Sequence, residues 1–322
     1  MPRSEFGVMN AAELLDRVFD VYKKSFIKQL TFSAAIGSAS FFLMFLIAIG
    51  AGIVAAAPFA LLVEINPNYF IAVVLIAVAS ILPVFLIWSA ASDAGHIILS
   101  KQAYCGFQVR LPLKNFPRIV LGAISVMLAQ FVLSIPWLLA VAAAVYFFVA
   151  GSVEINLFFD PYSLAGFLSA GSFVIFTILA ALAYVAYSNI FALAIPAAIF
   201  ERRFFFAPIK RSWQLMKGSF WKILGLRMLW SVTVYLLSYS LQGLWGVVSA
   251  LINSFSSGQS GISMYAAVLG NVFQSAAVIL IGFAVGPLGG ILTALLYFNQ
   301  RIKKEGMAVE LTLEKLSGSA AQ

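Results

Sequence analysis

The sequence predicts an all-α fold: a polytopic helical membrane protein of about six kinked transmembrane helices, with basic amphipathic interfacial helices on the cytoplasmic side. Composition is the first observation behind this prediction. Of the 322 residues, 62% are hydrophobic and 10% are charged, and the mean hydropathy is +1.00, whereas soluble proteins carry about 25% charged residues. The second observation is that several apolar runs exceed the roughly 20 residues that cross a bilayer core.

Hydropathy divides the chain into three predicted parts. These are an interfacial helix at 1–30, a membrane domain at 31–299 and a cytoplasmic tail at 300–322. Within the membrane domain we expect spans at 31–62, 69–91, 119–150, 167–200, 221–252 and 263–299. The first is longer than a bilayer requires, so it should tilt or break near Gly50, Gly52 and Pro58. Pro83 lies inside the second span, and Pro136 should bend the third.

Basic residues alternate along the chain with these spans. Lys and Arg number 5 in residues 1–30, 4 in 92–118, 7 in 201–227 and 4 from 300 onward, which accounts for all 20. The segments 64–68, 151–166 and 253–262 contain none. Since basic loops stay in the cytoplasm, we expect a multi-pass protein of the bacterial inner membrane with both termini cytoplasmic.

The segment 207–224 is basic and one-sided. Ile209, Trp213, Met216 and Phe220 recur at helical spacing, and such a helix lies in the membrane interface with its cations toward the headgroups. A related pattern precedes the first span, where Asn10 and Glu13 have capping-box spacing. The residues predicted to contact anionic lipid are Lys23, Lys24, Lys28, Lys210, Arg211, Lys217, Lys222 and Arg227.

Residues 14–30 align with 208–224 without a gap, at an offset of 194. The apolar stripe of the first segment is Leu15, Phe19, Tyr22 and Phe26. The identical pairs are Arg17 and Arg211, Lys23 and Lys217, Ser25 and Ser219, Phe26 and Phe220, Lys28 and Lys222, and Leu30 and Leu224. Two explanations remain open: internal duplication, or the common composition of interfacial helices that lead into spans.

Residues suited to catalysis are scarce. Cys105 is the one cysteine and His96 the one histidine, which exclude an internal disulfide and a His-rich metal centre. The sequence contains no phosphate-binding glycine loop with lysine and no nucleophile–base combination. We therefore expect no enzyme activity, no metal and no cofactor. Asp93 and His96 are three residues apart and could form a hydrogen-bonded pair, with a proton relay as its functional interpretation.

Several polar side chains fall within the predicted spans. Arg227 either extends to the headgroups from about two turns inside the fifth span, or points inward to an anionic lipid or to Glu201. The amides expected to bond between helices are Gln130, Asn189, Asn271, Gln274 and Asn299. In the sixth span, Gly282, Gly286 and Gly290 are predicted to pack against another helix, next to a bend at Pro287.

Two stretches carry a resemblance to a known family. One runs from Pro196 through Glu201 into Ala207–Lys222, and the other is 295–306. Together with 14–19 and 22–26 they resemble the prokaryotic glycerophosphoryl diester phosphodiesterase membrane-domain family, over nearly the whole chain. Asn299 and Gln300 depart from the acid and aliphatic residue expected there. The family's domain is sometimes joined to a soluble phosphodiesterase, which these 322 residues do not contain, and the resemblance implies no catalytic residues.

These observations favour a non-catalytic membrane anchor or scaffold that interacts with anionic lipid or with a partner system. The net charge is +8, and the basic residues that produce it lie at the ends of the spans. This placement favours lipid headgroups over nucleic acid. A partner membrane protein or a second copy of the chain is a further expected contact. The alternative is a transporter or accessory permease for a small lipid-like or peptide solute.

Overall fold

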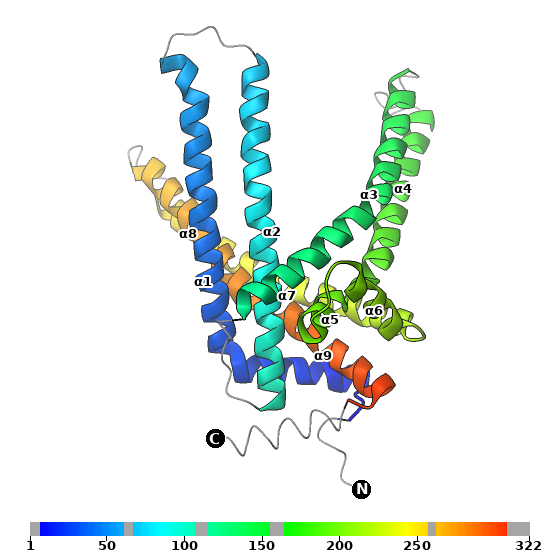
Figure 1. The fold of residues 1–322 in the computed structure, drawn as a ribbon. Coiled ribbons are helices and arrows are strands. Elements are labelled where there is room, and N and C mark those ends of the chain that lie inside the picture. The colour runs from blue at the N-terminus through cyan, green and yellow to red at the C-terminus, as the bar shows by residue number, and fades with distance from the viewer. Residues whose placement is uncertain (1–6, 61–66, 107–114, 155–163, 257–261, 308–322) are drawn as a thin grey trace.

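The computed structural model describes residues 7–60, 67–106, 115–154, 164–256 and 262–307 (Figure 1). Every regular element in these ranges is a helix, which confirms the predicted all-α class. The helices are α1 (Ala11–Ala60), α2 (Pro67–Cys105), α3 (Phe116–Glu154), α4 (Leu164–Asn189), α5 (Ala194–Glu201), α6 (Phe206–Met216), α7 (Phe220–Ser256), α8 (Ile262–Val285) and α9 (Pro287–Glu305).

Among the residues that the structure describes, six stretches are long and apolar enough to cross a membrane, as predicted. They are Ala11–Val54, Ala79–Cys105, Phe116–Ala142, Ile178–Glu201, Phe220–Leu251 and Val272–Glu305. Figure 1 shows α1 and α2 as a long upright pair, with α3 and α4 forming a second pair that leans away from it. Much of the apolar surface of these helices is exposed. This suits a lipid-facing position, because lipid tails are as apolar as the side chains.

The predicted interfacial helix and first span form one continuous helix. α1 runs without interruption from Ala11 to Ala60, so the expected break near Gly50 and Gly52 is absent. Figure 1 shows its first turns lying across the end of the bundle before the helix turns upward. The capping box is confirmed: the Asn10 N–H donates to Glu13 Oε2 at 3.1 Å, and the Glu13 N–H donates to Asn10 Oδ1 at 2.9 Å.

Two later spans are broken, whereas Pro83 and Pro136 stay inside continuous helices. The fourth span divides into α4 and α5 at residues 190–193, where turn hydrogen bonds such as Ile190 N–H to Tyr187 O at 3.0 Å replace the helical pattern. The sixth divides into α8 and α9 at Gly286. Pro287 has no N–H to continue the ladder and suits the first turn of a new helix.

Buried side chains concentrate where α9 meets α2 and α5. Tyr297 and Phe298 of α9 are fully buried. Phe298 stacks on Tyr104 of α2 with ring centroids 5.9 Å apart, and Phe200 of α5 lies 5.2 Å from Phe298. Aromatic contacts of this kind add to the free energy gained by burial. The core therefore sits at one end of the bundle.

Asn299 joins the two ends of the described chain. Its Oδ1 accepts the Met9 N–H at 2.9 Å, and its Nδ2 donates to the Met9 carbonyl at 3.0 Å. An ionised carboxylate accepts hydrogen bonds but cannot donate one, so an acid at 299 could not make both bonds. This accounts for the departure from the family pattern at this position. The helical backbone continues through the predicted boundary at 299, since α9 ends at Glu305.

Candidate functional site

Glu201, the last residue of α5, lies at the centre of a charged cluster. Its side chain is 12% exposed. Arg211 Nε of α6 donates to Glu201 Oε1 at 2.8 Å, and the Tyr297 hydroxyl of α9 donates to the same oxygen at 2.9 Å. Arg203 Nε pairs with Oε2 at 2.9 Å. One carboxylate thus links α5, α6 and α9.

Glu305, the last residue of α9, extends this cluster. It pairs with Arg211 Nη2 and, through Oε2, with Arg301 Nε at 2.9 Å. Burial disfavours the charge on Arg211, but the hydrogen bonds and ion pairs with Glu201 and Glu305 outweigh burial and raise the pKa of the Arg211 guanidinium. Arg211, predicted to contact lipid, therefore uses its charge to hold three helices together.

The lysines predicted to contact lipid have a different environment. Those in segments 14–30 and 208–224 are exposed, namely Lys23, Lys24, Lys28, Lys210, Lys217 and Lys222. Lys304 is exposed as well, but its Nζ donates to the carbonyls of Gln214 at 2.8 Å and Lys217 at 2.7 Å. A cation is favourable there, at the C-terminal end of α6. Sequence reasoning missed the roles of Glu305 and Lys304, although an acid among basic residues was a usable indication.

Arg227 points into the bundle. Its Nη1 donates to Asn189 Oδ1 at 2.9 Å, and the residue is partly buried. The inward direction agrees with one of the two interpretations, but the observed partner is Asn189, and the predicted contact to Glu201 is not made. Glu201 is held by Arg211, Arg203 and Tyr297 instead. The side-chain amide nitrogen of Asn189, Nδ2, is buried and has no hydrogen-bond partner among the described residues.

The hydrogen-bonded pair predicted for Asp93 and His96 does not form. His96 Nδ1 lies 2.5 Å from Gln29 Oε1, and its Nε2 lies 3.3 Å from Ser33 Oγ. The amide of Gln29 also donates to Ser100 Oγ at 3.4 Å. Both imidazole nitrogens are thus used in joining α1 to α2, which assigns His96 a structural role and removes the basis for a relay. Asp93 lies near this network, since it lines one cavity together with His96 and Ser33.

Asp93 and Arg227 line one cavity of about 520 Å³. Gln130 of α3 and Tyr184 and Ser188 of α4 also line it. The structure records no ion pair between Asp93 and Arg227 and no hydrogen bond to the Asp93 carboxylate from the part of the chain it describes. Two opposite charges therefore face a common space inside the apolar spans. Gln130 was predicted to bond between helices and is instead a lining residue of this cavity.

The three glycines of the predicted packing stripe have different surroundings. A Cβ atom on Gly290 would lie 2.7 Å from His96 Cβ, so α9 and α2 approach closely there. On Gly286 it would lie 2.8 Å from the Gly282 carbonyl oxygen, at the break between α8 and α9. On Gly282 it would meet no atom within 4 Å. Close approach of a neighbouring helix is thus seen at Gly290.

Within the described ranges, no three His, Cys, Asp or Glu side chains are grouped so that they could hold a metal ion. Cys105 is buried and takes part in no disulfide. The arrangement supplies fixed opposite charges, hydrogen-bonding groups and an apolar surround, which are the means of binding and positioning. That the protein has no enzyme activity stays a prediction.

The six apolar spans and the charged end define a polytopic helical membrane protein. Residues 161–316 match the family model described as the membrane domain of glycerophosphoryl diester phosphodiesterase. The resemblance inferred from the motifs is thereby confirmed over α4 to α9, and for the residues before 161 it stays a prediction. No curated protein and no solved structure matches the chain.

Proposed function

We propose that this protein is a non-catalytic scaffold of the bacterial inner membrane, with both termini in the cytoplasm, whose basic end binds anionic lipid. The observation that carries the proposal is a division of labour among the cations. Arg203, Arg211 and Arg301 pair with Glu201 and Glu305 inside the charged cluster. The lysines of the two basic segments, 14–30 and 208–224, are exposed.

Geometry and charge make this end suitable for an anionic surface. Each basic residue near such a surface contributes about 1 kcal/mol of attraction, and the cluster fixes α6, the helix that carries Lys210. Exposed aromatic side chains lie near them in the sequence, with Trp213 of α6 45% exposed and Trp221, next to Lys222, 76% exposed. Tryptophan favours the membrane–water interface, which supports placing these segments at headgroup level.

Lipid selectivity at Trp221 tests the proposal. A variant in which Trp221 is the one tryptophan retained is reconstituted with lipids that carry bromine on their acyl chains. The brominated lipid is either an anionic phosphatidylglycerol or a neutral phosphatidylcholine, and the fluorescence of Trp221 is measured. We expect stronger quenching by the anionic lipid at equal mole fraction. Replacing Lys210, Lys217 and Lys222 by Gln should remove most of that preference.

The matched control is Gln214→Ala, an exposed neutral position on the same helix. It should retain the preference for the anionic lipid. Equal quenching by both lipids, measured with Lys210, Lys217 and Lys222 all retained, would contradict the proposal. An unchanged preference in the triple lysine variant would contradict it as well, because the selectivity would then come from other groups.

The polar cavity favours a second candidate function, an accessory permease or transporter for a small amphipathic solute. Ionisable residues inside membrane spans mark substrate pathways more often than surface charges do, and Asp93 and Arg227 face one space. The test is solute flux into proteoliposomes. Loss of flux in Arg227→Gln and Gln130→Ala would support transport, and flux that is independent of both would remove this candidate.

A further inference from the structure

Three cavities adjoin one another along the helices. An apolar cavity of about 760 Å³ lies between α1, α2 and α8, and a second of about 420 Å³ lies beside it. Trp88, Ile279 and Phe283 line both. Asp93 and Gly286 line the second cavity and also the polar cavity of about 520 Å³. The lining is therefore continuous from an aromatic end to a charged end.

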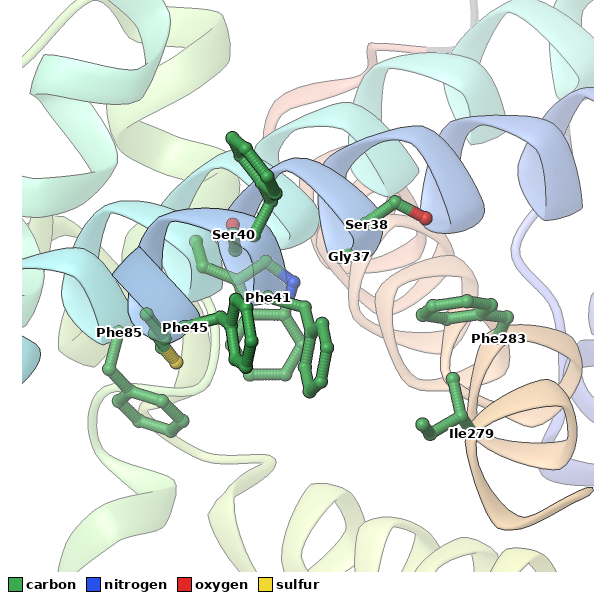
Figure 2. Close-up of a pocket in the computed structure, with 11 residues that line it drawn as sticks. Gly37, Ser38, Ser40, Phe41, Phe45, Phe85, Ile279 and Phe283 are labelled. Carbon is green, nitrogen blue, oxygen red and sulfur yellow. The ribbon is translucent and has the colours of Figure 1, made fainter. Parts of the chain in front are cut away.

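The aromatic end is open to the surroundings of the spans. Figure 2 shows Phe41 and Phe45 of α1 and Phe85 of α2 on one side of the cavity, with Ile279 and Phe283 of α8 on the other. Phe41 is 66% exposed and Phe85 50% exposed. These residues lie in or beside segments that cross the membrane, so this mouth faces acyl chains and is suited to receive one.

The charged end carries both signs of charge. Asp93 lies about 18 Å from the end of α2 and Arg227 about 10 Å from the start of α7, at 1.5 Å per residue. Both lie inside apolar spans of the structure, Ala79–Cys105 and Phe220–Leu251, in the half nearer the basic end. An ionised group without a partner is costly in an apolar medium. Arg227 has one hydrogen bond, to Asn189, and the described residues provide none to the Asp93 carboxylate, so both charges are available to a ligand.

We propose that the joined cavities bind one phospholipid with a zwitterionic amine–phosphate headgroup. The ammonium group lies at Asp93, the phosphate lies at Arg227, and an acyl chain lies along Trp88 into the aromatic cavity. A guanidinium suits phosphate because its donors match two oxygens at once. This site uses none of the surface lysines, so it stands apart from the anionic-lipid proposal.

The charges explain the choice of headgroup. An anionic lipid that lacks an amine would satisfy Arg227 but leave Asp93 buried without a cation. A cationic amphiphile without phosphate would satisfy Asp93 but leave Arg227 without an anion. Only a headgroup with both charges compensates the two side chains together. The aromatic end accounts for the preference for a membrane lipid over the water-soluble headgroup.

Native mass spectrometry of the full chain in detergent tests this site, with the dissociation constant of the first lipid adduct as the readout. The probes are dioleoyl phosphatidylethanolamine, dioleoyl phosphatidylglycerol and tail-free glycerophosphoethanolamine. We expect phosphatidylethanolamine to bind about tenfold more tightly than phosphatidylglycerol, the effect of one charge-assisted hydrogen bond. Asp93→Asn should remove this difference, and Arg227→Gln should weaken both adducts.

Gly282→Leu provides a test that leaves the charges unchanged. Gly282 lines the middle cavity, and a Cβ added there meets no atom within 4 Å. The larger side chain should fill the passage and weaken the phosphatidylethanolamine adduct about tenfold, since crowding of this kind costs on the order of 1–3 kcal/mol. The matched control is Gly243→Leu, a helical glycine of α7 that also meets no atom within 4 Å and lies apart from these cavities. Asp16→Asn, at an exposed carboxylate, is the control for Asp93→Asn.

Three results would overturn the assignment. One is equal binding of the two lipids by the unsubstituted chain. Another is a preference for phosphatidylethanolamine that survives Asp93→Asn, together with a phosphatidylethanolamine affinity that Gly282→Leu leaves unchanged. The third is displacement of the lipid by glycerophosphoethanolamine at a similar concentration, which would assign the site to a soluble solute. Gly282→Leu decides the matter even if a charge variant does not fold.

Discussion

The two basic segments, 14–30 and 208–224, bury the same register of side chains. The buried positions of the first are Leu14, Val18, Val21, Ser25 and Gln29, which align at an offset of 194 with Pro208, Ser212, Leu215, Ser219 and Ile223, all of them buried. Exposed positions correspond as well: Ile27 is 72% exposed and its counterpart Trp221 is 76% exposed. Composition alone does not fix which face packs inward, so the shared register supports internal duplication.

The two segments differ in their backbone. Residues 14–30 lie inside the unbroken helix α1, whereas 208–224 is interrupted between α6 and α7. The interruption centres on Gly218, which adopts a φ of +84° and aligns with the helical Lys24. A positive φ is readily accessible to glycine but strained for other residues. The comparison shows that one burial pattern can be kept while the path of the chain changes.

The aligned arginines have also taken different roles. Arg17 lies over the ring of Tyr104, 5.3 Å from its centroid, whereas Arg211 lies between Glu201 and Glu305. The second segment is therefore tied into its surroundings by charge, and the first by burial and an aromatic contact. The predictions that follow probe these similarities and differences.

The largest effect is expected at the shared buried face. Leu215→Ala removes a side chain that is 1% exposed and should lower the free energy of unfolding by about 3 kcal/mol. Its counterpart Val21→Ala, also 1% exposed, should cost about 2 kcal/mol because fewer atoms are removed. Denaturant titration in mixed micelles measures both. A cost below about 0.5 kcal/mol at either position, typical of surface substitutions, would break the proposed correspondence.

The arginines should separate the two segments. Arg211→Gln leaves Glu201 and Glu305 without a shared cation and should cost about 2 kcal/mol of the free energy of unfolding, less than the 3–5 kcal/mol of a fully buried pair. Arg17→Gln should cost about 0.5–1 kcal/mol, the value of an exposed cation–π contact. The same titration compares them. Equal costs would mean that the charged cluster contributes nothing special to the second segment.

Gly218 and Lys24 provide a reciprocal pair. Gly218→Ala places a Cβ at a positive φ and should cost about 1 kcal/mol, while Lys24→Gly introduces glycine into a helix and should also cost about 1 kcal/mol. Melting temperatures in detergent measure the two changes. If Gly218→Ala were neutral or stabilising, the break between α6 and α7 would not depend on the left-handed conformation.

The smallest effect is expected at the exposed, aligned lysines. Lys23→Gln and Lys217→Gln should each change the free energy of unfolding by less than about 0.5 kcal/mol. Each should nevertheless reduce the preference for anionic lipid by about fivefold, corresponding to about 1 kcal/mol. Quenching by brominated lipids measures that preference. A loss of stability without a change in lipid preference would assign these lysines to packing.

Local features of the sequence predicted the fold class and the six spans, because hydropathy and capping act over short distances. The Asn10–Glu13 box and the bend at Pro287 follow from such local chemistry. The break at residues 190–193 contains neither Gly nor Pro, so no local rule identified it. The predicted stripes included Phe19 and Trp213, which are 41% and 45% exposed, because hydrophobicity alone does not distinguish lipid from protein neighbours.

The site depends on contacts between distant parts of the chain. Arg211 and Glu305 are far apart in sequence, and neither spacing nor periodicity brings them together. The same holds for Asp93 and Arg227, whose common cavity arises only when α2 and α7 are placed. Sequence reasoning did single out both residues as ionisable groups in or beside apolar spans, but it gave Asp93 the wrong partner, His96.

The central claim is that both basic segments face the cytoplasmic leaflet, and single-cysteine labelling tests it most directly. With the buried Cys105 replaced by Ser, Lys23→Cys and Lys217→Cys are exposed in turn to a membrane-impermeant thiol reagent. We predict protection of both in intact cells and reaction of both in inverted membrane vesicles. Reaction of either position from outside intact cells, or labelling of the two from opposite sides, would contradict the account.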